Sequence, residues 1–444
     1  MSQRQHYAET EVDAPHDPLL TVARLAALHR DDSHVVHEQG ATWHFCAGAL
    51  AEITVDRRQV HYTCGTDRRS IPWTRRPLDV VADLLEALPV RRWRAYGWAG
   101  FELAEAQAGR PPAAGAAPLL HLVVPREEVR ITAGRALLRT TGPDGPDRLA
   151  ALLAGPAPER VSGQRGIAGL DLGVGADQYL KSVAAAVDEI GAGAFEKVVL
   201  SRVVPVPAAI DLVATFVHGR RHNTPARSFL LNLGGLRAAG FSPELVVSVT
   251  AAGLVRTQPL AGTRALTASA AENHRLREEL LADAKEIHEH QISVTAAYEE
   301  LGTVCEPGTV TVEEHMAVRE RGTVQHLASR LSGLLAPGLR NWDAFAALFP
   351  AITVSGIPKS AALAAVRAYE PVPREMYGGA VLAVDHDGEL DAALVLRAVY
   401  QQAGQVWLRA GAGIVRQSTP ERELEETCEK LRSIATYLIP APTP

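Results

Sequence analysis

The sequence TQPLAGTRAL (257–266) is followed by AKEIHEHQISV (284–294), and the rest of the chain is organised around these two segments. Gly262 marks a tight loop, and the second segment has the composition of a long helix. Glu286 and Glu289 are three positions apart, so they share one helix face with about 4.5 Å of axial rise between them. Neighbouring carboxylates repel each other unless a proton or a cation lies between them. The stretch therefore predicts a helix that carries a cation site.

A second acidic pair has the same spacing near the other end of the sequence. Glu423 and Glu426 lie in a segment, 420–437, that predicts a closing helix. If the two helices face each other, four carboxylates form an all-oxygen site, which favours Mg²⁺ over zinc or copper. Acidic pairs are also common on solvated helix faces, so one pair alone indicates little. His288 and His290 form no H-E-x-x-H motif, and we expect both to be exposed.

Groups suited to a small polyanion follow in the same part of the chain. Arg397 comes after a predicted strand, and Lys430 lies one helical turn beyond the second acidic pair. Gly411 and Gly413 in RAGAGI allow backbone N–H groups to approach a carboxylate closely. The same glycines would also fit a strand-end bulge. They lack the final glycine of a dinucleotide-binding fingerprint.

Two residues are suited to proton transfer. Lys197 lies in the apolar run EKVVLSRVVPV (196–206), where desolvation favours the neutral amine that serves as a base. The alternative is a charge at a strand edge, with its ammonium in water. Glu244 lies between Pro243 and a predicted strand, where burial would raise its pKa and make it an acid.

Lysine is rare in this chain. The 45 Lys and Arg residues include only Lys181, Lys197, Lys285, Lys359 and Lys430. Where arginine is the habitual cation, a lysine can mark a place that needs a compact ammonium or an amine that loses its proton. This argument points first to Lys197 and Lys430.

Composition excludes several classes of function. The 444 residues are 47% hydrophobic and 22% charged, as in globular proteins with a large core. A net charge of −6 without a basic block argues against nucleic acid as a partner. Four cysteines without C-x-x-C spacing fit a reducing cytoplasm better than a disulfide framework. The polar N-terminus and the absence of a run of about 18 apolar residues predict a cytoplasmic protein with no membrane span.

Strands mixed with helices and antiparallel hairpins predict an α+β fold, or a sheet sandwich faced with helices. We expect residues 1–176 to be a strand-rich N-terminal part of the same domain, with a linker at 142–176 rich in Gly, Pro and Ala. Residues 177–444 would form the catalytic core. Within the core we expect one long helix over 276–301.

The segments singled out above belong to a longer series of motifs. In chain order the series reads EKVVLSR, FSPELV, TQPLAGTRA, KEIHEH, RERGTVQHL, FPAITVSGIPK, YGGAV, DAALVLRA, RAGAGIV and ERELEETCEKL. This order resembles that of the chorismate-utilising enzymes, which include anthranilate synthase component I, aminodeoxychorismate synthase, isochorismate synthase and salicylate synthase. The resemblance covers residues 177–438 strongly and the N-terminal part loosely. PLAGTRAL, RERGTVQHL and PERELEETCEKL are most similar to the salicylate synthases of siderophore pathways.

The resemblance implies a single large α+β domain in which two antiparallel β-sheets form a sandwich surrounded by helices, with the site in a cleft. It implies Mg²⁺ held by Glu289 and Glu426, with Glu286 and Glu423 nearby or bridging through water. The metal would hold the ring carboxylate of chorismate. The resemblance further implies that the pyruvyl carboxylate is bound by Tyr377, Arg397 and the Gly411 amide, and that the ring-carboxylate side is lined by Gly262, Thr263, Gly413 and Lys430. It implies that Thr353 contacts the substrate and that His326 lies beside the ring. It also implies that Lys197 acts as the base and Glu244 as the acid.

The activity implied is that of a salicylate synthase, which converts chorismate to isochorismate and then to salicylate and pyruvate, for a siderophore or another natural product. Isochorismate synthase is the alternative, since it shares Lys197 and Glu244. Aminodeoxychorismate synthases that attack with a lysine carry it where this chain has Ala261. Anthranilate synthases usually lack the lysine at 197 and carry a tryptophan-binding motif that we do not find. A non-catalytic chorismate-binding module is the remaining alternative. We expect a monomer without a glutaminase subunit.

Overall fold

The computed structural model describes residues 6–74, 76–112, 118–142, 145–155, 166–322 and 324–442. Its helices are α1 Pro18–Leu28, α2 Pro77–Glu86, α3 Leu103–Gln107, α4 Gly145–Ala154, α5 Ala176–Gly191, α6 Leu212–His222, α7 Ala270–Ala282, α8 Ala284–Gly302, α9 Asn341–Leu348, α10 Lys359–Tyr369 and α11 Pro420–Ala435. Its strands are β1 Ala8–Asp13, β2 His34–Gln39, β3 Thr42–Val55, β4 Gln59–Cys64, β5 Asp67–Pro72, β6 Arg94–Ala99, β7 Leu120–Thr132, β8 Arg135–Thr140, β9 Lys197–Pro205, β10 Arg227–Leu233, β11 Leu236–Ser242, β12 Leu245–Val249, β13 Leu254–Thr257, β14 Leu260–Ala265, β15 Thr311–Arg321, β16 Val324–Leu334, β17 Gly356–Ile357, β18 Ala380–Asp385, β19 Leu390–Leu394, β20 Ala398–Gln402 and β21 Gln405–Ile414.

The strands form two antiparallel layers that share two long strands, β3 and β7. The first layer runs β1–β8–β7–β3–β2–β10–β11–β20–β21–β9–β17. The second runs β5–β4–β3–β7–β6–β18–β19–β12–β13–β16, and β16 also pairs with β14 and β15. Hydrogen bonds therefore connect both layers into one 21-stranded network. The predicted α+β sandwich is confirmed.

The corner between the layers lies in the middle of β3. Gly48 has a φ of 65°, which a residue with a Cβ rarely adopts, and the register with β7 shifts between Ala49 and Ala51. Residues before the shift pair with β2, and residues after it pair with β4. A bulge bends a strand and increases its twist, so one strand serves both layers.

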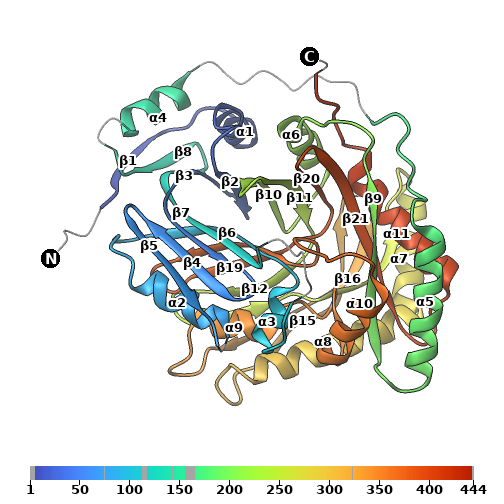
Figure 1. The fold of residues 1–444 in the computed structure, drawn as a ribbon. Coiled ribbons are helices and arrows are strands. Elements are labelled where there is room, and N and C mark those ends of the chain that lie inside the picture. The colour runs from blue at the N-terminus through green and yellow to red at the C-terminus, as the bar shows by residue number, and fades with distance from the viewer. Residues whose placement is uncertain are drawn as a thin grey trace.

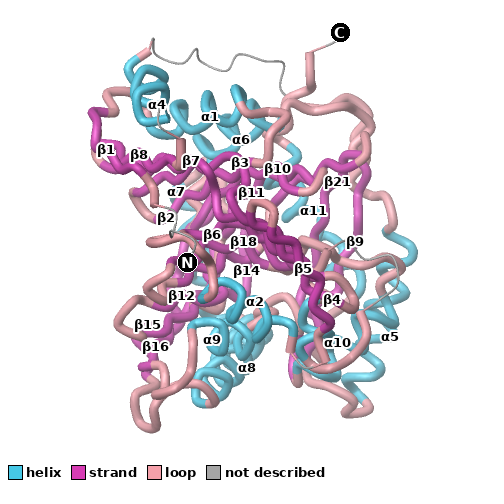
Figure 2. Tube along the Cα trace, turned by 60° about the vertical axis from the view of Figure 1, so that its left-hand side comes forward, coloured by secondary structure: helices cyan, strands magenta, loops and turns pink. Residues whose placement is uncertain are grey.

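Helices cover the outer face of each layer. Figure 1 shows α1, α4 and α6 at one end of the molecule and α2, α8 and α9 at the other, with the strands between them. Figure 2, turned by 60°, shows the same order of helices, strands and helices. The buried apolar side chains form three clusters. One lies between the two sheets and includes Phe229, Trp98 and Tyr400, and two larger clusters lie under the helices on either side.

The expected helix over 276–301 is two helices, and Asp283 is the reason. Its backbone is extended, with φ −75° and ψ 111°, so α7 ends there. Its carboxylate then accepts hydrogen bonds from the N–H groups of Lys285 and Glu286 and caps α8. The flanking segments both favour helix, so composition alone hides the break. The closing helix agrees with the prediction and begins with Pro420 in its first turn.

The N-terminal part shares its sheets with the rest of the chain, because β2 pairs with β10 and β6 pairs with β18. Within the expected linker, 145–154 form α4, while 143–144 and 156–165 lie outside the described residues. The division at residue 176 stays a prediction. Across the described ranges, no helix is long and apolar enough to span a bilayer.

Candidate active site

A pocket opens between the two layers, lined by β9 and β21 on one side and by β14 and β16 on the other. Helices α8 and α11 contribute side chains to its wall. Predicted residues that line the pocket are Glu244, Gly262, Thr263, Glu289, His326, Thr353, Tyr377, Arg397, Gly411, Gly413, Glu426 and Lys430. The other three, Lys197, Glu286 and Glu423, lie just behind, beside Glu289, Thr263 and Glu426. The structure therefore brings all the predicted residues to one place.

Two glycines of β21 make this arrangement possible. A Cβ on Gly413 would lie 2.3 Å from Glu289 Oε1 and 3.2 Å from Lys197 Cε. A Cβ on Gly411 would lie 2.9 Å from the Tyr377 hydroxyl. Any larger residue would push these side chains apart. The glycines of RAGAGI thus allow close packing of the site, in addition to the backbone approach expected from the sequence.

Each of the four predicted metal ligands is buried and has its own basic partner. The nitrogen–oxygen distances are 2.9 Å for Lys197–Glu289, 2.8 Å for Lys285–Glu423, 2.7 Å for Lys430–Glu426 and 3.2 Å for Arg264–Glu286. Side chains of the protein itself therefore supply cations between the crowded carboxylates. Three of the five lysines lie here, so the rarity of lysine was a useful signal.

Crowding still affects the pKa values of these carboxylates. Burial, together with the charge of Glu426, raises the pKa of Glu423 to about 7, and the same two causes raise the pKa of Glu286. Burial opposes the charge on Glu426 as well, but Lys430 and Lys285 hold its pKa below the usual value. Charge on Glu286 and Glu423 is thus only partly compensated by the basic partners.

These residues fit a divalent cation. All four are oxygen donors, and Glu423 Oε2 is buried without any hydrogen-bond partner in the described structure. Mg²⁺ uses one or two protein carboxylates and retains water or an anionic substrate. Glu289 and Glu426 reach the pocket, so they would be its direct ligands, with Glu286 and Glu423 beside them. A bound cation would replace the basic partners on these oxygens.

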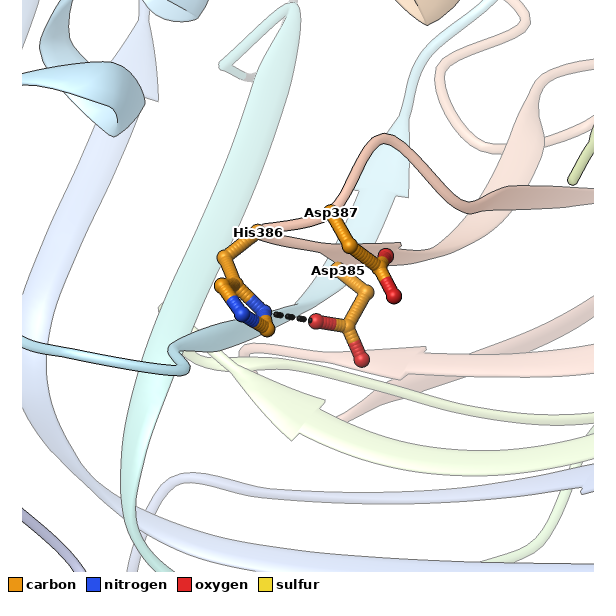
Figure 3. Close-up of side chains that lie close together, drawn as sticks. All are labelled: Asp385, His386 and Asp387. Atoms are coloured by element: carbon orange, nitrogen blue, oxygen red, sulfur yellow. Dashed lines mark hydrogen bonds and ion pairs between the residues drawn. The ribbon is translucent and has the colours of Figure 1, made fainter. Parts of the chain in front are cut away.

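A different acidic group lies at the turn between β18 and β19, shown in Figure 3. Its members Asp385, His386 and Asp387 have ligand atoms within 4.8 Å of one another. His386 already pairs with Asp385, and Asp385 accepts a 2.5 Å hydrogen bond from Arg94. His386 and Asp387 are exposed. This turn is an ordinary charged surface, and none of its three residues lines the pocket.

Arg397 is a buried cation without a counterion. One of its nitrogens donates to the carbonyl of Arg321 at 2.9 Å, the other to His326 Nε2, and no carboxylate pairs with it in the described parts of the chain. Burial and the charge of Arg321 lower the pKa of Arg397 to about 9. Buried charges normally have a partner, so a guanidinium left unpaired in a pocket is suited to an anionic ligand.

His326 supports Arg397. Burial, with the charges of Arg397 and Lys430, lowers the pKa of His326 well below its usual value, so its ring is neutral. Its Nε2 accepts from Arg397, which leaves Nδ1–H to donate to Thr263 Oγ1 at 3.0 Å. Both ring nitrogens are therefore engaged within the protein.

The two candidate proton-transfer groups are both buried. The Lys197 side chain is 1% exposed, and its ammonium contacts Glu289 and donates to Ser293 Oγ at 3.1 Å. The alternative of a solvated strand-edge lysine is therefore wrong. Burial raises the pKa of Glu244 to about 8, even though Thr353 Oγ1 donates to it at 2.5 Å. Glu244 is thus a protonated acid at neutral pH, as its position in the sequence predicted.

A family model described as chorismate binding enzyme matches residues 32–436. The chain belongs to this family. The salicylate synthase of Mycolicibacterium paratuberculosis is 41% identical over 427 residues, which are 95% of this chain and 94% of that protein. Anthranilate synthase component 1 of Streptomyces coelicolor is 40% identical over 296 residues, or 64% of this chain and 58% of that protein.

The fold of this chorismate binding enzyme is similar to that of several solved structures. An isochorismate synthase of Bacillus anthracis has a TM-score of 0.72 at 22% identity and covers 94% of this chain and 98% of its own. Anthranilate synthase component I of Streptococcus pneumoniae has a TM-score of 0.74 at 24% identity and covers 89% and 92%. The menaquinone-specific isochorismate synthase of Escherichia coli has a TM-score of 0.73 at 22% identity and covers 98% and 96%.

Sequence reasoning missed part of the chorismate binding enzyme's site. Arg264 and Lys285, the partners of Glu286 and Glu423, were not selected, although Lys285 precedes Glu286 and is one of the rare lysines. His290 was expected to be exposed and is fully buried, because its face of α8 packs on β16. Its Nε2 lies 2.7 Å from Ser329 Oγ, and burial lowers its pKa to about 4.

Replacing Lys285 with methionine is expected to increase any thermal stabilisation that follows the addition of Mg²⁺. The change removes a cation from Glu423 and leaves more uncompensated negative charge for a divalent ion. Without metal, Tm should fall by about 2 °C or more, and Mg²⁺ should restore more of it than in the unmodified protein. The measurement is thermal unfolding with EDTA and with Mg²⁺. Lys181, which is exposed, provides the control variant Lys181→Met. An equal Mg²⁺ effect in all three proteins would contradict the expectation.

Proposed function

We propose that this enzyme is a salicylate synthase, which converts chorismate through isochorismate to salicylate and pyruvate with Mg²⁺ as cofactor. The observation that carries the proposal is that a buried amine, Lys197, and a protonated carboxyl group, Glu244, both lie at a pocket whose guanidinium has no carboxylate partner among the described residues. The relative of almost full length that is named salicylate synthase supports the same choice.

Chorismate carries two carboxylates, and the pocket offers two places for them. Arg397 has no counterion in the described part of the chain, and the Tyr377 hydroxyl and the Gly411 backbone lie beside the same pocket. These three would take the pyruvyl carboxylate. The ring carboxylate would lie near Thr263, Gly413 and Lys430. Bound to Glu289 and Glu426, Mg²⁺ would supply positive charge for that carboxylate.

The first step moves a hydroxyl group. The Lys197 ammonium faces Glu289 in this structure and would first lose a proton. The neutral amine would then take a proton from water while the water oxygen bonds to ring carbon C2. The ring double bonds shift, the C4–O bond breaks, and Glu244 gives its proton to the departing hydroxyl, which leaves as water. Water is consumed and released, so isochorismate is an isomer of chorismate. An acid and a base placed in this way each contribute roughly 10²–10⁴ in rate.

The second step needs no further protein group in the proposal. The hydrogen on C2 would move to the methylene carbon of the enolpyruvyl group as the C–O bond to the ring breaks. Pyruvate leaves, and the ring becomes the aromatic ring of salicylate. The protein would contribute by holding the side chain over the ring in a reactive conformer. Thr353 and Leu396 line the pocket where such a conformer would be held.

Isochorismate synthase is the second candidate. Two of the solved structures that share the fold are isochorismate synthases, and the first step uses the same two residues. Attack by an enzyme lysine is not proposed, because Ala261 stands at the wall of the pocket where that lysine would be. The choice between the two candidates therefore depends on the second step alone.

Product analysis tests the proposal. We expect chorismate with Mg²⁺ to yield fluorescent salicylate and an equal amount of pyruvate, and chelation by EDTA to stop both until Mg²⁺ is restored. Liquid chromatography identifies the aromatic product, and lactate dehydrogenase coupling measures pyruvate. Isochorismate that accumulates without pyruvate would replace the proposal with the isomerase. Turnover that is indifferent to EDTA would remove the metal from it.

A further inference from the structure

Arg321, the last residue of β15, connects the two ends of the pocket without lining it. Its Nε donates to the carbonyl of Pro243 at 3.3 Å, and Nη1 donates to the carbonyl of Glu320 at 3.1 Å. Its own carbonyl accepts the 2.9 Å hydrogen bond from Arg397. The side chain of Arg321 thus contacts the segment that carries Glu244, and the backbone of Arg321 contacts Arg397.

The contact with Pro243 bears directly on Glu244. The Pro243 carbonyl belongs to the peptide unit that ends at the Glu244 nitrogen. On the other side, the Glu244 carbonyl accepts from Ser242 Oγ at 2.9 Å and from the Leu394 N–H at 3.1 Å. Both peptide units that flank Glu244 are therefore fixed, one of them by the Arg321 guanidinium.

The charge of Arg321 has no structural counterion either. Its pKa is lowered by burial and by the charge of Arg319, and among the described residues no carboxylate pairs with it. Several other arginines in the interior have one; the Arg227 guanidinium, for example, lies 2.6 Å from the Asp391 carboxylate. Arg319, two positions before Arg321, pairs with Glu314. An arginine kept for stability alone would be expected to have such a partner.

We propose that Arg321 is a positioning residue, which holds the Pro243–Glu244 peptide so that the acid faces a substrate whose carboxylate is on Arg397. This role rests on the proposed function of Glu244. The planar fork of the guanidinium suits it, since two of its nitrogens reach two different carbonyls at once. Arg397 is bound to the backbone of Arg321, so a change of the Arg321 side chain leaves the bond to Arg397 in place.

The strand end around Arg321 is also held by other contacts. Thr224 Oγ1 donates to the Glu320 carbonyl at 3.2 Å and lies 3.3 Å from the Gly322 nitrogen, which donates to it. Substitution of the Arg321 side chain therefore keeps two anchors of the backbone. Loss of the side chain should displace Glu244 more than it disturbs the fold.

The test compares Arg321→Met and Arg321→Lys with Arg319→Met, measuring kcat and KM for chorismate. We expect kcat of Arg321→Met to fall about 10- to 100-fold with KM nearly unchanged, because the acid is misplaced while the binding groups remain. Arg321→Lys should be intermediate, since one ammonium reaches one carbonyl only. Arg319→Met, which removes a partly exposed ion pair away from the pocket lining, should behave as wild type.

Several outcomes would overturn the proposal. If Arg321→Met has the kcat and KM of wild type, Arg321 has no role in the reaction. If only KM rises, Arg321 acts in substrate binding and does not position the acid. If Arg321→Met fails to fold, as judged by circular dichroism and Tm, Arg321→Lys decides, and a wild-type kcat there would refute the role of the fork. Failure of the proposed function is distinct, because wild-type enzyme would then release no salicylate and pyruvate from chorismate before any variant is made.

Discussion

Replacing Glu244 with glutamine is expected to stop turnover of chorismate while the substrate still binds. Glutamine fills the same space and keeps a hydrogen-bonding group for Thr353, but it cannot give a proton to the departing hydroxyl. The expected loss in kcat is roughly 10²–10⁴-fold. Pyruvate release measures kcat, and calorimetric titration with chorismate measures binding. The binding residues, Arg397 above all, are untouched by the change.

The pH dependence of the wild-type enzyme should report the same group. Burial raises the pKa of Glu244 to about 8, so the carboxyl group is protonated below that pH and loses its proton above it. Since the acid acts in its protonated form, kcat/KM, which reports the groups of the free enzyme, should fall as pH rises through about 8. The control for the Glu244→Gln variant is Glu299→Gln, an exposed substitution on α8, which should keep full activity. Full activity in Glu244→Gln would show that another group protonates the hydroxyl.

Replacing Lys197 with methionine is expected to have an effect of similar size, roughly 10²–10⁴-fold in kcat. Methionine keeps the apolar stem in the interior but removes the amine that would take a proton from water. It also leaves Glu289 without the ammonium that lies 2.9 Å from it. Pyruvate release again measures kcat, and Mg²⁺ should be kept at saturation so that metal binding does not limit the rate.

The chain offers a close control for that variant. Lys359 lies 2.6 Å from Glu300, which is also on α8, so the two pairs share a helix and a kind of interaction. Lys359→Met should lower Tm and leave kcat unchanged, because neither Lys359 nor Glu300 lines the pocket. If both lysine variants lower kcat alike, the loss in Lys197→Met comes from a weakened helix. The assignment of Lys197 as the base would then be wrong.

The parts of the fold and site that follow from local pattern were predictable. Helical spacing identified the acidic pairs of α8 and α11, and the apolar run around Lys197 correctly indicated burial. The raised pKa of Glu244 followed from its place before an apolar strand. These properties depend on a few residues that are close in sequence, which is why a single sequence contains them.

Other features depend on which segments meet, and a single sequence does not state that. Arg264 pairs with Glu286 only because β14 packs against α8, and Arg321 reaches Pro243 only because β15 ends beside the link between β11 and β12. His290 was expected to be exposed, because the sequence alone does not show which of the two histidines, His288 or His290, faces the core. The break at Asp283 required knowledge of the cap, which composition does not reveal.

The shared strands β3 and β7 limit how the pocket can open. Many enzymes admit substrate by rotating two rigid bodies about a hinge. Here one layer cannot rotate away from the other without breaking the ladders that β3 forms with β2, β4 and β7. Most residues of β3 are buried, and ladders of this kind open only together with a large part of the fold. Chorismate and its products must therefore pass through local movements at the rim of the pocket, while the two layers remain one rigid frame around the reaction.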